Sequence, residues 1–167
     1  MYIVDSSSLI NIDRRLPEKI FPGAWQLLSD LVNNGRLIAP VEVNYELTRG
    51  SDEVCKWVDS NEKCFKKDSD ELFEKVKEIQ SLFPLMADPN SPHHADPFLV
   101  ALVLLQKNQD RFEKSEFCLL TDEKGTGVEM RDSNLKDIKK IPDVCRYYQI
   151  NCLDHLSFIQ KEGWKIQ

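Results

Sequence analysis

Apolar residues along the chain fall into short unbroken runs and into longer stretches in which they recur every three or four residues. These runs have the length of buried β-strands, and the strands that they predict span residues 2–5, 37–39, 117–120 and 150–152. The stretches with helical spacing predict helices at 9–14, 24–33, 41–48, 51–60, 68–83, 97–106, 142–148 and 154–160. Residues 87–95 and 121–140 are polar and contain Pro or Gly, so we expect loops there. Short strands that alternate with helices predict an α/β fold whose parallel sheet is covered on both faces.

The helix predicted at 68–83 has the clearest amphipathic pattern. Its apolar residues repeat at intervals of three and four, at Leu72, Phe73, Val76, Ile79 and Phe83. It closes a charged helical segment, residues 51–83, which we place inside one domain covering residues 1–167, because this length is usual for a single domain. The apolar stripe is expected to pack on the domain, or to contact a second copy or a partner protein.

The charge composition narrows the range of partners. The chain has 22 Lys and Arg against 28 Asp and Glu, a net charge of −6, which argues against nucleic-acid binding through bulk charge. Basic residues after the third predicted strand form either a local rim that guides phosphate groups or a solvated loop. They are Lys124, Arg131, Lys136, Lys139 and Lys140.

Hydrophobicity and cysteine usage indicate the compartment. The longest apolar run, 98–105, is far shorter than the roughly 20 residues that a membrane span needs, so we expect no membrane contact. The N-terminal residues lack the basic region and apolar run of a secretory signal. The five cysteines are widely spaced without a Cys-x-x-Cys motif, which favours free thiols and a cytoplasmic location over a disulfide framework or a zinc site.

Acidic residues lie at the ends of the predicted strands. Asp5 ends the first strand, and Asp122 and Glu123 come just after the third. Glu46 lies in the helix directly after the second strand, and Asp96 immediately precedes a buried helix. Because ligands bind beyond the carboxyl ends of parallel strands, we expect these acids to converge on one crevice.

Such a cluster of acids needs a counter-charge. Two carboxylates about 4 Å apart repel by roughly 4 kcal/mol at an effective dielectric constant near 20. Carboxylate oxygens favour Mg²⁺ or Mn²⁺ over zinc, and such a cation can hold a phosphodiester and activate a water molecule. Taken singly, Asp5 and Asp96 fit helix caps. Glu46 alone fits a solvated helix residue, and Asp122 and Glu123 fit turn acids; only the joint arrangement favours a metal site.

The histidines add little to this metal chemistry. His93 and His94 are adjacent, so their side chains point in different directions, and no third imidazole follows at a ligand spacing. We expect a loop position or a contact with substrate rather than a zinc site. His155 lies in the last predicted helix and is expected to be structural.

In five successive blocks the sequence resembles the PIN-domain nucleases, the family that includes the VapC-type toxins. The blocks are YIVDSSSLI (2–10), LIAPVEVNYEL (37–47), HADPFLVALVLL (94–105), CLLTDEKG (118–125) and IPDVCRYYQINCLDHLSFI (141–159). The resemblance implies a PIN-like three-layer α/β/α sandwich with a central, mostly parallel sheet of four to five short strands. It also implies a metal-dependent ribonuclease that hydrolyses RNA phosphodiester bonds with Mg²⁺ or Mn²⁺.

The same resemblance assigns roles to individual residues. The catalytic, metal-binding acids would be Asp5, Glu46, Asp96 and Glu123, with Asp122 as a further candidate ligand. Ser7 and Thr121 would support the acids or the substrate through their hydroxyl groups. The family likeness further implies the toxin of a type II toxin–antitoxin pair, whose antitoxin covers the acidic crevice with an inserted Arg or Lys, and a homodimer.

The fourth block departs from the family pattern. Where the family reads Thr-Asn-Asp, this chain reads Thr121, Asp122 and Glu123, and a Gly-containing loop replaces the following Asp-Phe. The departure keeps open a non-catalytic PIN-like binding or regulatory module. It also leaves open which of the two acids is the fourth ligand, and whether one metal ion or two bind. A metal-dependent phosphatase is disfavoured, because position 7, where its second Asp is expected, holds Ser7.

Overall fold

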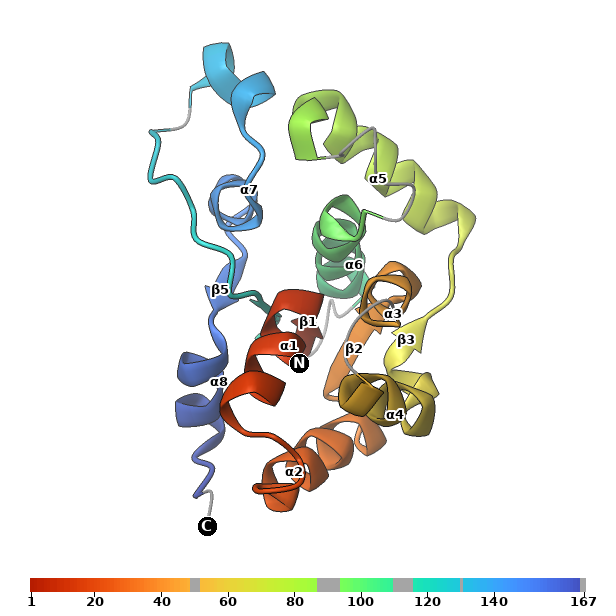
Figure 1. Ribbon diagram of the computed structural model, residues 1–167. Coiled ribbons are helices and arrows are strands. Elements are labelled where there is room, and N and C mark those ends of the chain that lie inside the picture. Colours follow the sequence, from red (N-terminus) through yellow and green to blue (C-terminus); the bar gives the residue numbers. More distant parts are fainter. Residues whose placement is uncertain (49–51, 87–93, 110–115, 130, 166–167) are drawn as a thin grey trace.

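The structure is a computed structural model that describes residues 1–48, 52–86, 94–109, 116–129 and 131–165. Five short strands form one sheet: β1 (Tyr2–Val4), β2 (Leu37–Pro40), β3 (Phe65–Lys66), β4 (Cys118–Leu120) and β5 (Asn151–Leu153). Their order is β3-β2-β1-β4-β5, and every neighbouring pair is parallel. The predicted α/β class, with a parallel sheet of short strands between helices, is confirmed (Figure 1).

The order of the strands creates a switch point between β1 and β4. The chain passes from β1 outward to β2 and β3, and then crosses to β4 and β5 on the other side of β1. Tyr2 is in register with Leu37 of β2 on one side and with Cys118 of β4 on the other. At such a point the connections leave two adjacent strands in opposite directions, which opens a crevice at their carboxyl ends. The fold therefore provides a binding site where β1 and β4 end.

Helices cover both faces of this sheet. On one face lie α5 (Asp70–Leu82), α6 (Asp96–Gln109) and α7 (Ile141–Tyr147), and on the other lie α1 (Ser6–Arg15), α2 (Pro22–Asn33), α4 (Asp52–Ser60) and α8 (His155–Glu162) (Figure 1). The short helix α3 (Val41–Leu47) follows β2 directly and contacts α1 and β3. This arrangement is consistent with the three-layer sandwich of the PIN-like class.

Helix α6 is the centre of its layer. It contacts β1, β2 and β4, and its buried residues are Pro97, Leu99, Val100, Ala101, Leu102, Val103 and Leu105. Helix α5 packs on α6, where the ring of Phe73 meets the ring of Phe98 with centroids 5.9 Å apart. Because α6 lies between the sheet and α5, it is apolar on more than one face. The apolar stripe of α5 therefore packs on the domain itself.

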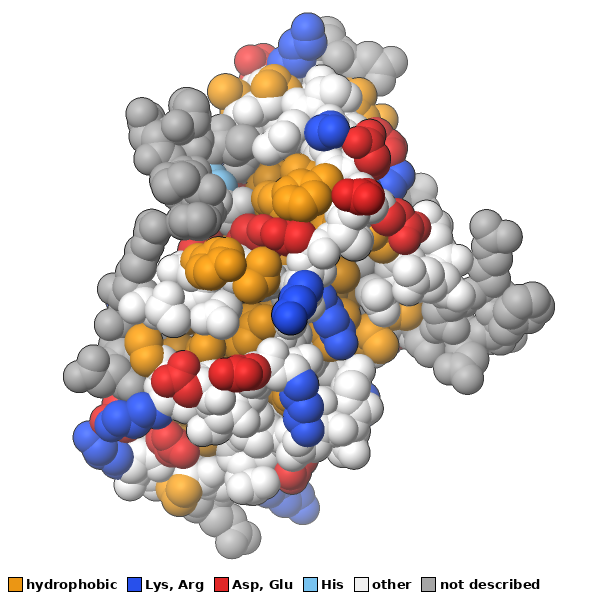
Figure 2. Space-filling model, turned by 90° about the vertical axis from the view of Figure 1, so that its right-hand side faces the viewer, with side chains coloured by type: hydrophobic (Ala, Val, Ile, Leu, Met, Phe, Trp, Pro, Cys, Tyr) orange, Lys and Arg blue, Asp and Glu red, His pale blue; other side chains and the backbone are white. Residues whose placement is uncertain are grey.

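The surface on the side of α5 and β3 is mixed in character. Figure 2 shows small groups of apolar side chains there, separated by acidic and basic side chains. On α5, ion pairs join Lys75 to Glu78 at 2.5 Å and Lys77 to Glu74 at 2.7 Å. Ion pairs of this spacing are typical of a solvated helix face, and acidic and basic side chains alternate over the described part of this side.

Four short elements were not predicted from the sequence. They are the two-residue strand β3 and the 3₁₀ helices η1 (Glu62–Cys64), η2 (Pro84–Met86) and η3 (Asp132–Asp137). The prediction of an uninterrupted loop at 121–140 is wrong, because η3 interrupts it. Most of the loop predicted at 87–95, including His93, lies outside the described residues. Within the ranges that the structure describes, none of the helices combines the length and the apolar character that a membrane span requires.

Candidate functional site

The predicted acids meet in a cleft of about 480 Å³ at the carboxyl ends of β1 and β4. The cleft is lined by Asp5, Ser6, Ser7, Asn11, Glu46, Leu85, His94, Asp96, Asp122, Glu123, Lys139, Lys140 and Ile141. All five acids named from the sequence are in this set, although they come from segments far apart in the chain. We refer to this cavity as the acidic cleft.

Asp5 is the most deeply placed of these acids. It is only 5% exposed and stands at the N-cap position of α1, but its side chain makes no capping hydrogen bond. Instead, the hydroxyl groups of Ser7 and Thr121 donate to its Oδ2 atom at 2.5 and 2.9 Å. Burial raises the pKa of Asp5; these two hydrogen bonds oppose the rise, and the charges of Glu46 and Glu123 add to it. The carboxylate is thus held towards the cleft and is not used as a cap.

Glu46 is held between α1 and α6. The hydroxyl of Ser6 donates to its Oε2 atom at 2.6 Å, and the backbone N–H of Ala95 donates to its Oε1 atom at 3.0 Å. The same Ser6 hydroxyl lies 3.3 Å from Oδ1 of Asp5. Glu46 is therefore not a freely solvated helix residue, and Ser6 connects it to the neighbouring acid.

Asp96 begins α6 at the edge of the cleft. Its side chain is 18% exposed, and its Oδ1 atom lies 3.3 Å from Nδ1 of His94. Burial raises the pKa of Asp96; His94 opposes the rise, and the charges of Asp5 and Glu123 add to it. His94 therefore lines the cleft, and the predicted contact with substrate stays a prediction.

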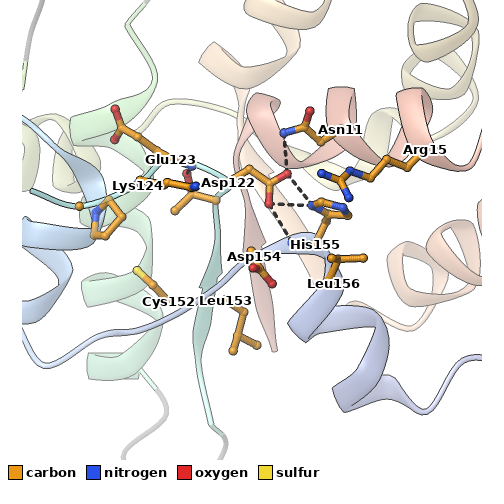
Figure 3. A pocket seen from close by; sticks show the side chains of 13 residues that line it. Asn11, Arg15, Asp122, Glu123, Lys124, Cys152, Leu153, Asp154, His155 and Leu156 are labelled. Carbon is orange, nitrogen blue, oxygen red and sulfur yellow. Dashed lines mark hydrogen bonds and ion pairs between the residues drawn. The ribbon is translucent and has the colours of Figure 1, made fainter.

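The adjacent acids Asp122 and Glu123 point in different directions, as Figure 3 shows. The carboxylate of Asp122 accepts a hydrogen bond of 2.7 Å from the side chain of Asn11 and one of 2.9 Å from the backbone N–H of His155. The ring nitrogen Nδ1 of His155 lies 2.7 Å from its Oδ2 atom. The side chains of Asp122 and His155 are only 8% and 6% exposed. Asp122 therefore joins α1 to α8, and His155 has the structural position that the sequence predicted.

Glu123 faces the acidic cleft from the opposite side of this turn. Its Oε1 atom accepts a hydrogen bond from the ammonium group of Lys140, and its Oε2 atom accepts one of 2.8 Å from the backbone N–H of Ile141. Its own backbone N–H donates to the hydroxyl of Thr121 at 3.1 Å. The hydrogen bond to Glu123 raises the pKa of Lys140, and the charges of Asp96 and Asp143 add to the rise.

A second cavity, of about 530 Å³, adjoins the acidic cleft on the far side of Asp122. The two cavities share Asn11, Asp122 and Glu123. The exposed cations Arg15 and Lys124 lie at the second cavity, which also contains the buried pair of Asp122 and His155 (Figure 3). Of the five basic residues predicted to form a rim or a solvated loop, Lys124 lines the second cavity, and Lys139 and Lys140 line the acidic cleft.

The donor chemistry of the acidic cleft fits Mg²⁺ or Mn²⁺. Its carboxylates supply the oxygen ligands that these cations prefer. The raised pKa values of Asp5 and Asp96 reflect burial and mutual repulsion, both of which a bound cation would relieve. The residues that would hold a cation are Asp5, Glu46, Asp96 and Glu123.

In this structure, three of these carboxylates accept hydrogen bonds from hydroxyl or ammonium groups of the protein itself. In the part of the chain that the structure describes, no three His, Cys, Asp or Glu side chains form a group that could enclose a metal ion. Hydroxyl groups hold Asp5 and Glu46, and Lys140 holds Glu123. A bound cation would therefore replace some of these donors and draw the carboxylates together.

Sequence reasoning missed two polar residues of the cleft, Ser6 and Asn11, and the pairing of Lys140 with Glu123. Ser6 stands next to Ser7 in the run of three serines, and Asn11 lies four residues after Ser7, on the same face of α1. Their positions relative to Ser7 could have indicated from the sequence that both residues lie at the site. No local pattern pairs Lys140 with Glu123, because 17 residues separate them.

One comparison with known proteins identifies a family. No curated protein and no solved structure matches the chain. A family model described as "Domain of unknown function (DUF4411)" matches residues 2–166, which include every residue of the acidic cleft. The chain therefore belongs to the DUF4411 family.

Proposed function

We propose that the protein is a metal-dependent ribonuclease that hydrolyses phosphodiester bonds of RNA. The observation that carries the proposal is the meeting of Asp5, Glu46, Asp96 and Glu123 in one cleft at the switch point of a parallel sheet. Four carboxylates that share a partly buried cleft repel one another unless a cation compensates them. The resemblance to PIN-domain nucleases supports the choice of RNA as substrate and of Mg²⁺ or Mn²⁺ as the cation.

Some residues of the cleft would bind the cation, and others would orient the carboxylates that bind it. Asp5, Glu46, Asp96 and Glu123 would hold one or two divalent cations through their carboxylate oxygens. A bound cation supplies the orientation of the scissile phosphate and a lowered pKa of the attacking water. Hydroxyl groups support two of the acids, since Ser7 and Thr121 orient Asp5, and Ser6 orients Glu46. No covalent nucleophile is needed.

Asp122 has a different part in this proposal. Its carboxylate is only 8% exposed and is held by Asn11 and His155, whereas that of Glu123 is 22% exposed. Glu123 faces the cleft instead, and we assign it as the fourth acid. Asp122 would hold the turn after β4 in place and so fix the position of the adjacent Glu123.

The biological setting is also a proposal. Family likeness favours the toxin of a type II toxin–antitoxin pair, acting in the cytoplasm and forming a homodimer. An antitoxin would cover the acidic cleft and insert an Arg or Lys between the carboxylates. Lys140 supports this idea, because its ammonium group already fits beside Glu123 in the same cleft.

A non-catalytic binding module is the second candidate. It is favoured by two observations: the ion pair of Lys140 with Glu123, and the lack of a preassembled group of three metal ligands among the described residues. A binding module would not need to keep a competent cation site, whereas a ribonuclease must. Metal affinity and RNA cleavage therefore separate the two candidates.

The test is cleavage of a mixed single-stranded RNA pool by the purified protein. The reaction is run with Mg²⁺, with Mn²⁺ and with a chelator, beside Asp96→Asn and the control Asp59→Asn, which changes an exposed acid on α4. We expect metal-dependent cleavage that Asp96→Asn abolishes and Asp59→Asn retains. Full cleavage by Asp96→Asn would overturn the site assignment. A protein with neither cleavage nor cation binding would leave the binding module as the better account.

A further inference from the structure

Lys140, one of the basic residues predicted to form a rim or a solvated loop after the third strand, lies within the acidic cleft. It directly precedes α7, and its ammonium group pairs with Oε1 of Glu123. The other oxygen of Glu123 accepts the backbone N–H of Ile141, so two consecutive residues grip one carboxylate. The side chain of Lys140 is 35% exposed and that of Glu123 is 22% exposed, so solvent screens this pair only in part.

The ammonium group faces the negative charges of several elements. Glu123 comes from the end of β4 and Asp96 from the start of α6, and both charges act on Lys140. Asp5 and Glu46 line the same cleft from α1 and α3. Lys139, Lys140 and His94 also line the cleft, and Nδ1 of His94 lies 3.3 Å from Oδ1 of Asp96.

One lysine has the position of a counter-ion in this cleft. Among the described Lys and Arg residues that line it, Lys140 is the one with an ion pair to a cleft carboxylate; Lys139 lines the cleft without such a pair. A single positive charge offsets only part of the charge of four acids. The ammonium group and a divalent cation would both be attracted to Glu123, and they would repel each other if both were bound there.

We propose that Lys140 is a built-in counter-ion that competes with a divalent cation for Glu123. This inference rests on the proposed cation site. In the metal-free protein the ammonium group holds Glu123 and keeps the cleft together. A cation bound by the acids would displace Lys140 from Glu123, and the carboxylate of Glu123 would then be available as a further ligand. The displaced ammonium group then faces the cleft, where it can pair with a phosphate oxygen of the substrate.

Competition between Lys140 and the cation for Glu123 predicts how removal of Lys140 changes the affinity for the cation. If binding of the cation displaces Lys140, removal of Lys140 must strengthen binding of the cation by the same coupling. A partly exposed ion pair contributes at most about 1 kcal/mol, so the expected gain in affinity is about fivefold. A lysine that merely supported the architecture of the cleft would have the opposite effect, since its removal would weaken the site.

The experiment is a Mn²⁺ titration by calorimetry on the full chain. Wild type is compared with Lys140→Met, with the charge-conserving Lys140→Arg, and with Lys139→Met as the matched control in the same cleft. We expect Lys140→Met to bind Mn²⁺ about fivefold more tightly, while Lys140→Arg and Lys139→Met stay near wild type. Thermal unfolding gives a second measurement. In chelator, Lys140→Met alone should unfold at a lower temperature than wild type. Added Mn²⁺ should then raise the unfolding temperature of Lys140→Met more than that of wild type.

The outcomes separate this inference from the proposed function. Wild type that binds Mn²⁺ with an affinity unchanged in Lys140→Met would overturn the competition and leave the cation site standing. Mn²⁺ binding by Lys140→Met alone would support the competition and explain a weak wild-type site. Absence of Mn²⁺ binding by both proteins would overturn the competition together with the cation site.

Discussion

The hydroxyl group of Thr121 donates a hydrogen bond of 2.9 Å to Oδ2 of Asp5, and this contact joins the carboxyl ends of β4 and β1 across 116 residues of sequence. It lies at the switch point of the sheet, where the fold opens a crevice. The hydroxyl also accepts the backbone N–H of Glu123 at 3.1 Å. One threonine therefore fixes the position of two of the proposed catalytic acids.

Thr121→Val should weaken both the fold and the site. It removes a hydrogen bond to a buried carboxylate and leaves a polar oxygen of Asp5 with one donor fewer, which costs about 2 kcal/mol of unfolding free energy. Urea denaturation checks the value. Thr48→Val is the control, because the hydroxyl of Thr48 donates to the backbone oxygen of Tyr45 at the exposed end of α3. Equal stability losses for the two variants would contradict the role assigned to Thr121.

The two acids after β4 should respond differently to loss of charge. Asp122→Asn disturbs the buried contacts with Asn11 and His155 and should lower the unfolding free energy by about 1–3 kcal/mol. Glu123→Gln should instead abolish metal-dependent cleavage with a smaller loss of stability. Urea denaturation and the RNA cleavage assay, run on both variants, test the division. A stable, inactive Asp122→Asn protein beside an active Glu123→Gln protein would reverse the assignment.

Glu42 gives the fold a dependence on pH. Burial raises the pKa of Glu42 from 4.5 to about 7, and the neighbouring charge of Asp68 adds to the rise. Since the folded pKa lies above the unfolded one, the stabilising effect of the proton is fully present below about pH 4.5 and is lost as the pH rises through about 7. Glu42→Gln does not titrate, so its stability relative to wild type should increase between about pH 5 and about pH 8.

Urea denaturation at both pH values measures this difference. Glu71→Gln is the matched control, because Glu71 is an exposed carboxyl on α5. The control should keep the same stability difference from wild type at both pH values. A difference between Glu42→Gln and wild type that does not change with pH would exclude Glu42 as the titrating group.

Gly125 has a steric role beside the site. A Cβ atom at this position would lie 2.8 Å from Oδ1 of Asp143, whose other oxygen accepts the backbone N–H of Thr126 at 2.7 Å. Gly125→Ala should therefore push the segment after Glu123 away from α7 and cost about 1–3 kcal/mol of stability. Gly23→Ala, in α2 with open space around it, should instead stabilise the protein by about 0.5–1 kcal/mol. A Gly125→Ala variant with unchanged stability would contradict this prediction, because it would show that the side chain of Asp143 moves away from the added methyl group.

The sequence predicted most of the fold because its strands and helices follow simple periodic patterns. The strand at Phe65–Lys66 was missed, since two residues carry no period and their pairing with β2 is a long-range property. The 3₁₀ helix at Asp132–Asp137 was missed because its sequence is polar and gives no apolar repeat. These failures concern short elements that are defined by tertiary contacts rather than by local propensity.

The acids of the candidate site were predictable for a different reason. Asp5 and Glu123 follow strands, and the ends of parallel strands lie at one edge of a sheet, so topology alone brings them together. The partners of these acids were not predictable in the same way. Lys140 reaches Glu123 and His155 reaches Asp122 through loops and helix packing, which leave no spacing rule in the sequence.

The central claim is that the carboxylates of the acidic cleft hold a divalent cation. Anomalous diffraction from crystals soaked in Mn²⁺ tests it most directly, because the signal locates the ion without any substrate. We predict an anomalous peak in the cleft at a coordination distance of about 2.1 Å from carboxylate oxygens of Asp5 and Asp96, with Lys140 moved away from Glu123. A cleft without such a peak at saturating Mn²⁺, with Lys140 still paired to Glu123, would contradict the account.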